Sequence, residues 1–352
     1  MEAAGTSDLA TLARRFAFAG EFDSSPLYRA LGTVVASDEF LLRLASRARV
    51  GQYPTFLFFA AVHYLLLSGV EHDLAHYYPS MVGADALPPE GAGTAFVSFC
   101  ATFEPELIAL LETRLVQTNN VKRSMALRLG LVAVGRQLVS PVHLIEIGAS
   151  AGVHLRCDRY GYHLGGRSFG DPRSPVQISS QWCGDRAVPD LDALPPLASV
   201  TGIDMHPLDA SNADDRRWLE ALVWPENRHE ADLLQRALDV VATDPPPIRA
   251  GDAINVCPDL AADLPPGEPR VVFLAATRLH VPADRRDAFD TAIESLGRNA
   301  PLYRVILEGP DDRRSTEPLS HKGTLDLRSP SGSLTHLTTV DGHLESVEPL
   351  NL

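Results

Sequence analysis

Residues 142–152, with the sequence VHLIEIGASAG, restrict the possible folds of this chain more than any other stretch. The first six are mostly branched and apolar, which predicts a buried strand. Glu146 and Gly148 stand at its end, and the small residues 149–152 lead into a predicted helix. Ligands of parallel α/β sheets bind beyond the carboxyl ends of the strands, where a turn of small residues lets the backbone come close. The stretch therefore predicts an α/β fold with a ligand site at this turn.

The charge balance and the cysteines exclude several classes of protein. The 352 residues include 45 acidic and 31 basic ones, for a formal net charge of −14. Nucleic acid is not an expected partner, because proteins that bind it usually carry a basic surface. The four cysteines are far apart, which predicts reduced thiols rather than a zinc–thiolate site.

A membrane is not an expected partner either. The longest apolar run, residues 56–67, is interrupted by His63 and is too short to cross a bilayer. The first residues lack the basic-then-apolar order of a secretory signal. We therefore expect a cytoplasmic protein.

Residues 1–140 are predicted to form an all-helical domain. Ser25 followed by Pro26 indicates a capped helix start. Residues 54–68 are apolar on every side, as expected for the central helix of a bundle. The other predicted helices are residues 8–18, 38–48, 104–115 and 121–139.

Residues 141–352 alternate between short apolar runs and helical segments, which predicts a parallel sheet with crossover helices. A terminal hairpin is predicted around Asp341 and Gly342. An inserted segment is expected at about residues 153–198, because the second strand begins only at residue 199. The later predicted strands are residues 199–204, 248–250, 270–276 and 302–308, and the predicted helices are residues 214–223, 230–242 and 284–296.

The glycine turn and the strands after it resemble the S-adenosylmethionine-dependent methyltransferases. The pattern Glu-x-Gly-x-x-x-Gly is similar to their first motif, although Ser150 stands where many of them have a glycine. The resemblance implies a Rossmann-like parallel sheet, with Asp204 accepting hydrogen bonds from the ribose and Asp252 near the adenine. The interval between the turn and Asp204 is longer than the usual spacing of about 20 residues. The residues that would frame this cofactor are Glu146, Gly148, Ser150 and Gly152.

Most of the chain is also similar to a bacterial family catalogued as domain of unknown function 2332. The similarity runs from Phe16 to about Glu308. It includes the segments AAVHYLLLSG, TRLVQTN, EIGASAGVHL with DRYGY, GDPRSPV, GID with HPLD, WLEALVWPE and GDA. The family implies a shared fold and no particular reaction. It commonly reads Gln-Thr-Asn-Glu-Val-x-Arg where this chain has Asn120 in place of the glutamate, so a charge found in relatives is missing here.

A polar cluster between two predicted helices is a substrate-binding candidate. It consists of Gln117, Asn119, Asn120 and Arg123. The planar donor fork of an arginine suits a carboxylate, sulfate or phosphate. A helix cap with a solvated face is the alternative interpretation.

Two histidines and the residues around them are the catalytic candidates. His280 follows the strand 270–276, and a histidine's reference pKa of about 6.5 suits a general base. Thr277 and Arg278 could face the same pocket, and His154 could approach the cofactor or the substrate from the turn. A loop histidine without a role is the alternative for His280.

The segment after the turn supplies three more candidates, Asp158, Arg159 and Tyr160. Arg159 and Tyr160 could contact the substrate, and Asp158 could take part in catalysis. An Asp–Arg pair that holds the inserted segment explains Asp158 equally well.

A metal site is not expected. His72 and His76 lie one helical turn apart, and with His63 they raise the possibility of zinc. Two histidines at this spacing are more often ordinary surface residues.

The leading functional hypothesis is an S-adenosylmethionine-dependent methyltransferase that acts on a small, anionic molecule. The alternative is an enzyme of the same fold that no longer uses S-adenosylmethionine and catalyses cyclisation or elimination on a small natural-product intermediate. A non-catalytic subunit or scaffold is the third hypothesis. Assembly into homo- or hetero-oligomers is compatible with all three.

Overall fold

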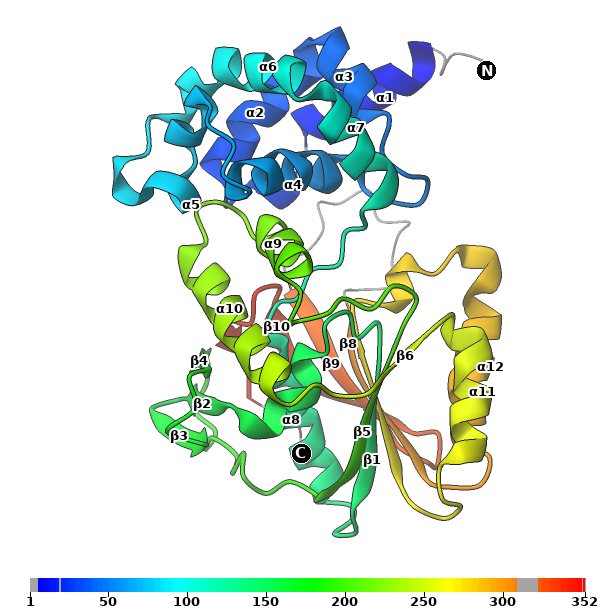
Figure 1. Cartoon of the computed structure of the whole chain (residues 1–352). Coiled ribbons are helices and arrows are strands. Elements are labelled where there is room, and N and C mark those ends of the chain that lie inside the picture. Colours follow the sequence, from blue (N-terminus) through cyan, green and yellow to red (C-terminus); the bar gives the residue numbers. More distant parts are fainter. Residues whose placement is uncertain (1–5, 19, 309–321, 350, 352) are drawn as a thin grey trace. The chain divides into compact units, whose positions relative to one another are not determined.

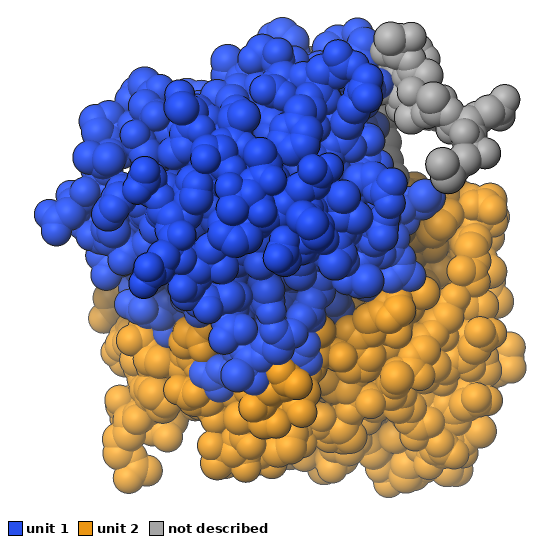
Figure 2. All heavy atoms as spheres, turned by 45° about the horizontal axis from the view of Figure 1, so that its top comes forward, with its two compact units in different colours: residues 1–118, 213–232 blue, residues 119–212, 233–352 orange. Residues whose placement is uncertain are grey.

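The computed structural model describes residues 6–18, 20–308, 322–349 and 351. The chain divides into two compact units, coloured separately in Figure 2. Unit 1 comprises Met1–Thr118 and Ala213–Asp232, and unit 2 comprises Asn119–Asn212 and Leu233–Leu352. Each unit therefore contains segments that are distant in the sequence.

Unit 1 is helical. Its central helix, α4 (Pro54–Leu67), is buried along most of its length, as its apolar sequence predicts. Ser25 caps the helix that begins at Pro26, with its side chain accepting a hydrogen bond from the amide of Tyr28. The other helices are α1 (Thr6–Ala17), α2 (Pro26–Ser37), α3 (Glu39–Ala45), α5 (Pro79–Val82), α6 (Ala92–Thr102), α7 (Glu104–Thr113) and α9 (Ala213–Ala221), with short 3₁₀ turns at η1 (Gly20–Phe22), η2 (Asp73–Tyr77), η3 (Gly83–Asp85) and η4 (Pro89–Gly91).

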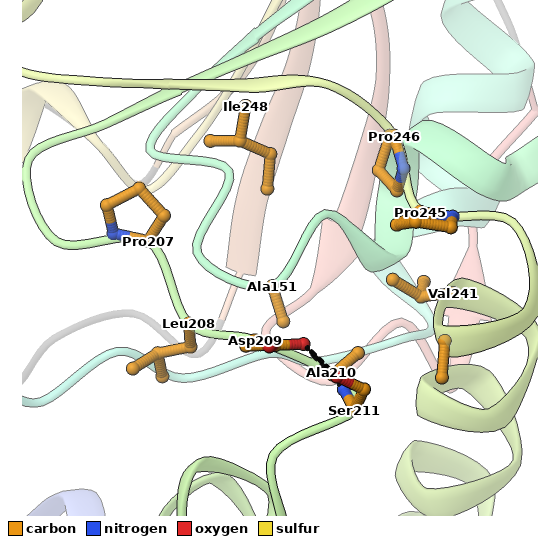
Figure 3. A pocket seen from close by; sticks show the side chains of 11 residues that line it. Ala151, Pro207, Leu208, Asp209, Ala210, Ser211, Val241, Pro245, Pro246 and Ile248 are labelled. Atoms are coloured by element: carbon orange, nitrogen blue, oxygen red, sulfur yellow. Dashed lines mark hydrogen bonds between the residues drawn. The ribbon is translucent and has the colours of Figure 1, made fainter.

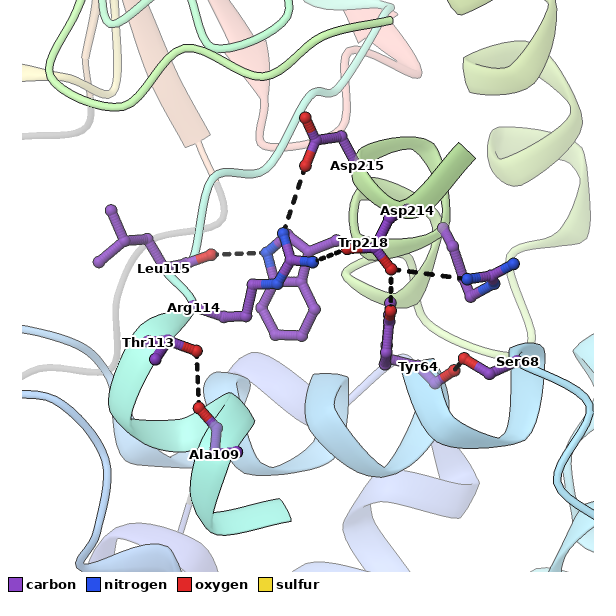
Figure 4. Close-up of polar contacts among 10 residues, drawn as sticks. Tyr64, Ser68, Ala109, Thr113, Arg114, Leu115, Asp214, Asp215 and Trp218 are labelled. Carbon is purple, nitrogen blue, oxygen red and sulfur yellow. Dashed lines mark hydrogen bonds and ion pairs between the residues drawn. The ribbon is translucent and has the colours of Figure 1, made fainter. Parts of the chain in front are cut away.

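Helix α9 belongs to unit 1 because of a group of polar and aromatic contacts (Figure 4). Arg114 forms ion pairs with Asp214 and Asp215 at the start of α9. The indole nitrogen of Trp218 donates to the carbonyl of Leu115 at 2.9 Å. The hydroxyl of Tyr64, on α4, donates to Asp214. These contacts join α9 to a segment about a hundred residues earlier.

Unit 2 is built on a mixed sheet whose centre is parallel. In the described residues eleven strands form the order β3-β2-β4-β11-β10-β9-β8-β7-β1-β5-β6. The five strands from β8 to β6 are parallel, and β9 and β10 extend them as an antiparallel hairpin. The strands are β1 (Val142–Ile147), β2 (Gly161–Leu164), β3 (Arg167–Gly170), β4 (Gln177–Trp182), β5 (Leu197–Asp204), β6 (Ile248–Ala250), β7 (Arg270–Ala275), β8 (Leu302–Glu308), β9 (Lys322–Arg328), β10 (Leu334–Asp341) and β11 (Ser346–Val347).

The two faces of β1 have different environments. Ile145 and Ile147 join an apolar core with α11 (Ala253–Asp263) and α12 (Arg286–Ser295), which lie together along one side of the sheet (Figure 1). Alternation along the strand places Glu146 on the other face. Helix α8 (Arg123–Gly135) packs against β8 and β9. Helix α10 (Arg228–Thr243) belongs to unit 2 from Leu233 onwards.

Several elements differ from the sequence-based expectations. The glycine turn leads into a 3₁₀ helix, η5 (Val153–Arg159), with non-helical backbone at Arg156, and not into a crossover helix. The inserted segment forms strands β2, β3 and β4. The main terminal hairpin is β9–β10, whereas the pairing across Asp341 and Gly342 is a single pair of residues.

The division into units differs from the boundary expected at residues 140 and 141. Helix α8 belongs to unit 2 because it packs on β8, where a side chain at Gly130 would overlap Val305. The segment with α9 belongs to unit 1. Helices α6 and α11 were not expected from the sequence.

No single helix in the described ranges is both long and apolar enough to span a bilayer. Pro89–Thr102 and Glu104–Thr113 meet the length and composition criteria only as a pair bent by 82°. All four cysteines are free, and only Cys183 is exposed.

Candidate functional site

The carboxyl ends of β1, β5, β7 and β8 form the candidate site. Numbered in chain order, the five parallel strands follow the order 3-2-1-4-5, so the winding direction reverses between β1 and β7. Ligands of open α/β sheets bind beyond the strand ends at such a reversal. The side chains at these ends are therefore the first to examine.

The turn after β1 is held by Asp204, at the end of β5. Gly148, Ser150 and Gly152 all have positive φ angles, of 81°, 49° and 77°. The amide of Ser150 donates to one carboxylate oxygen of Asp204 at 2.8 Å, and the amide of His206 donates to the other at 2.8 Å. One carboxylate thus fixes the loops after two neighbouring strands.

The loop after β7 is held by Glu308, at the end of β8. One oxygen of Glu308 accepts hydrogen bonds from the amides of Thr277 and Arg278, each at 3.0 Å. Burial raises the pKa of Glu308, while these two amides and the nearby arginines Arg123 and Arg278 oppose the rise. The hydroxyl of Thr277 donates to the carbonyl of Ile147 at 2.9 Å, which joins this loop to β1.

Glu146 and His154 form a buried pair. The carboxylate of Glu146 lies 2.6 Å from Nδ1 of His154, and the two side chains are 2% and 6% exposed. The other ring nitrogen, Nε2, lies 2.9 Å from the carbonyl oxygen of Asn120. The second carboxylate oxygen of Glu146, Oε2, is buried and has no hydrogen-bond partner within the described residues.

Arg123, the first residue of α8, lies near two carboxylates without a direct contact to either. Burial lowers the pKa of its guanidinium, and Glu308 and Glu146 oppose this effect by charge attraction. In the described ranges its side chain forms no hydrogen bond and no ion pair. The hydroxyl of the next residue, Ser124, is buried and also lacks a partner there. The start of α8 therefore offers an arginine that can bind an anion.

Comparison with known proteins identifies the family. The chain matches the family model described as an uncharacterized protein conserved in bacteria, DUF2332, over residues 10–348. The chain belongs to the DUF2332 family. No curated protein and no solved structure matches it.

The structure of this DUF2332 protein brings together part of the predicted polar cluster. The side-chain amide of Asn119 donates to the hydroxyl of Ser150 at 2.8 Å, and the carbonyl of Asn120 meets His154. Arg123 lies near Glu146. Gln117 belongs to unit 1, and the other three residues belong to unit 2.

The residues expected after the turn have structural contacts. Asp158 and Arg159 are exposed and form an ion pair at 3.4 Å, and Arg159 also contacts Asp244 at 3.2 Å. Tyr160 is buried, and its hydroxyl donates to the carbonyl of Val153 at 2.6 Å. Arg159 thus ties the end of η5 to Asp244, just after α10, and the roles predicted for these three residues stay predictions.

Two other predicted residues lie on separate loops. His280 is exposed at the end of η6 (Arg278–His280). Asp252 caps α11 and forms an ion pair with Arg285 at 2.8 Å. The carboxylate expected near the adenine is therefore already bound by an arginine. Within the described residues no group of three or more His, Cys, Asp or Glu side chains is arranged to hold a metal ion.

A pocket of about 240 Å³ opens beside the glycine turn (Figure 3). Ala151, Leu208, Val241, Pro246 and Ile248 contribute to its largely apolar lining. Asp209 also lines it, and hydrogen bonds from Ser211 lower the pKa of this carboxyl. The pocket suits an apolar group better than an anion.

Sequence reasoning missed Glu308 and the pairing of Glu146 with His154. Glu308 is the last residue of a predicted strand, and a search for acidic residues at the ends of the predicted strands would have identified it. The Glu146–His154 contact has no comparable sequence signal, because it depends on the path of η5.

Proposed function

We propose that this protein is an S-adenosylmethionine-dependent methyltransferase that acts on a small molecule. The observation that carries the proposal is the arrangement of Arg123 and Glu308 at the reversal of the sheet. Arg123 has no ion-pair partner in the described ranges. Glu308 ends strand β8, which lies next to β7 in the sheet. A cation beside a carboxylate can bind an amino acid, because the cation attracts the carboxylate of the amino acid and the carboxylate attracts its ammonium. S-adenosylmethionine carries such an amino-acid group at one end.

Asp204 supports the same ligand at its other end. The carboxylate accepts two backbone amides, which fix its position, and each oxygen has more than one lone pair. Ribose hydroxyls are donors that such a carboxylate binds in open α/β sheets. Asp252 fits its expected role less well because of its ion pair with Arg285.

The bound cofactor would supply an electrophilic methyl group on a sulfonium. The contribution of this chain is binding, orientation and exclusion of water. Arg123 and Glu308 would hold the amino-acid end, Asp204 would hold the ribose, and the turn from Gly148 to Gly152 would let the backbone approach. Positioning of this kind can supply much of a rate enhancement.

Calorimetric titration with S-adenosylmethionine and S-adenosylhomocysteine tests the proposal. We expect micromolar binding to the wild type. Arg123→Gln should weaken binding about 10-fold to 100-fold, as expected for one lost charge-assisted contact. Arg136→Gln is the matched control, because Arg136 lies exposed at the other end of α8. Absence of binding to the folded wild type would overturn the proposal.

A second candidate function is supported by the local structure of the turn. Ser150 has a positive φ and its hydroxyl contacts Asn119, and η5 is followed by inserted strands. These features agree with an enzyme of this fold that acts on another small molecule by cyclisation or elimination. Arg123-dependent binding of a free amino acid such as L-methionine, without binding of S-adenosylmethionine, would favour this candidate.

A further inference from the structure

The hydrogen bonds of His154 determine how many protons the Glu146–His154 pair holds. A carbonyl oxygen only accepts, so the contact of Nε2 with Asn120 requires a proton on Nε2. The contact between Nδ1 and Glu146, at 2.6 Å, requires another proton between the two atoms. This proton belongs either to an imidazolium or to a carboxylic acid. In both cases the pair has no net charge.

The surroundings of the pair isolate this second proton. Glu146 and His154 are almost fully buried, and the ring of His154 packs edge-on against Phe273 with centroids 5.9 Å apart. Cys157 and Tyr160 also lie near Glu146, and burial raises the pKa of Cys157 to about 12 and that of Tyr160 above its usual range. Both therefore stay neutral near pH 7. Arg123 is the cation near Glu146, and Glu308 faces that arginine.

The unpartnered oxygen of Glu146 indicates where a ligand would act on the pair. Oε2 is buried and receives no hydrogen bond from the described residues. A buried carboxylate oxygen without a donor is unfavourable, and a positive charge close to it lowers the proton affinity of the pair as a whole. The shared proton would then pass to the solvent, the hydrogen bond between Nδ1 and Glu146 would be lost, and the charge of the pair would change from zero to −1.

We propose that the Glu146–His154 pair determines which ligand charge the site prefers, by releasing one proton when a cationic ligand binds. This inference rests on the proposed function. S-adenosylmethionine carries a carboxylate, an ammonium and a sulfonium and has a net charge of +1, whereas S-adenosylhomocysteine has a thioether and no net charge. Release of one proton balances the added positive charge of S-adenosylmethionine. S-adenosylhomocysteine adds no net charge, so its binding needs no proton release.

Calorimetry in two buffers measures this proton release. Titration near pH 7 in phosphate and in Tris, which differ in ionisation enthalpy, gives the number of protons exchanged. We expect release of about one proton with S-adenosylmethionine and none with S-adenosylhomocysteine, as proton linkage requires. Glu146→Gln and His154→Asn should each abolish the difference between the ligands. Equal proton counts for both ligands in the wild type would overturn the inference and leave the proposed function intact.

His143 provides a matched control. It lies at the other end of β1, and its ring contacts Ser199 at 2.8 Å and Glu268 at 2.7 Å. It is therefore another His–Glu pair on the same strand. His143→Gln should leave the difference in proton release unchanged. Loss of the difference in this variant as well would contradict a specific role for His154.

A measurement without ligand tests the proton count directly. Nitrogen NMR of the ring of His154 should show both nitrogens protonated near pH 7, or isotope-edited infrared spectroscopy should show a protonated Glu146 carboxyl. A neutral ring together with an ionised Glu146 would overturn the inference. This outcome does not depend on ligand binding, so it is distinguishable from failure of the proposed function.

Discussion

Arg270 shows how a single residue can join two helices of unit 2. It is 0% exposed at the start of β7. Its guanidinium donates to the carbonyl of Leu296, at the end of α12, at 2.7 Å. It also donates to the carbonyls of Ala261 and Leu264, at the end of α11, each at 3.3 Å. The last carbonyls of a helix lack partners within it and favour a cation.

Replacement of Arg270 tests this role. Arg270→Met should lower the free energy of unfolding by about 3 kcal/mol, because buried carbonyls of two helix ends would lose their donor. Arg298→Met, at an exposed position just after α12, should change it by less than about 0.5 kcal/mol. Urea denaturation measures both. Equal effects of the two variants would contradict the role assigned to Arg270.

His63 predicts a loss of stability in mild acid. It is buried between the carbonyl of Ala221 and the hydroxyl of Ser80, and burial lowers its pKa from 6.5 to about 4. The histidine of the unfolded chain therefore binds a proton at a higher pH than His63 of the folded protein. The stability that the neutral His63 contributes is present above pH 6.5 and is lost as the pH falls towards 4. Between pH 7.5 and 5 the loss should be about 2 kcal/mol. Urea denaturation of the wild type and of His63→Gln should show this pH dependence only in the wild type.

At the scale of elements, strands were easier to predict than the segment after the glycine turn. Strand β1 is recognisable because its apolar residues are adjacent in the sequence. The segment from Val153 also has apolar residues at helical spacing, yet η5 ends after seven residues. The hydroxyl of Tyr160 bonds back to Val153, and Arg156 donates to the carbonyl of Asp244 at 2.6 Å. These tertiary contacts override the local helical pattern.

The backbone conformation of the glycine turn leads to a prediction about stability. Gly148 has a φ of 81°, and a Cβ there would lie 2.8 Å from the hydroxyl oxygen of Thr277. Gly148→Ala should therefore destabilise the protein by about 2 kcal/mol through backbone strain and crowding. Gly20→Ala is the control, because a Cβ at Gly20 would have no atom within 4 Å. Thermal denaturation would contradict this argument if both variants were equally stable.

At the scale of the whole molecule, the chain passes between its two units three times, after residues 118, 212 and 232. The boundary predicted near residue 140 could not account for these passages. The assignment of α9 to unit 1 depends on contacts of Trp218 and Asp214 with residues about 100 to 150 positions earlier in the chain. The candidate site shows the same limit. Asp204 is recognisable at the end of a strand, but the approach of Arg123 to Glu308 depends on how α8 packs.

A truncation tests this organisation. A fragment of residues 119–352 would keep α9 without its partners Tyr64 and Arg114, and would expose Trp218, which is 1% exposed in the full chain. We expect this fragment to bind a hydrophobic dye and to aggregate. Replacement of residues 213–232 in the fragment by a short Gly–Ser linker should reduce both effects. Light scattering and dye fluorescence compare the two fragments, and identical behaviour would contradict the assignment of α9.

The shortness of η5 has a consequence for how this fold can evolve. A long helix at this turn would direct the positive end of its dipole at the ligand and would favour phosphate groups. Here a 3₁₀ helix of seven residues takes its place, so the charges near this turn belong to side chains such as Arg123 and Glu146. Side chains change by single substitutions, whereas a helix dipole is a property of the backbone. Proteins with this backbone can therefore acquire ligands of different charge without altering their architecture.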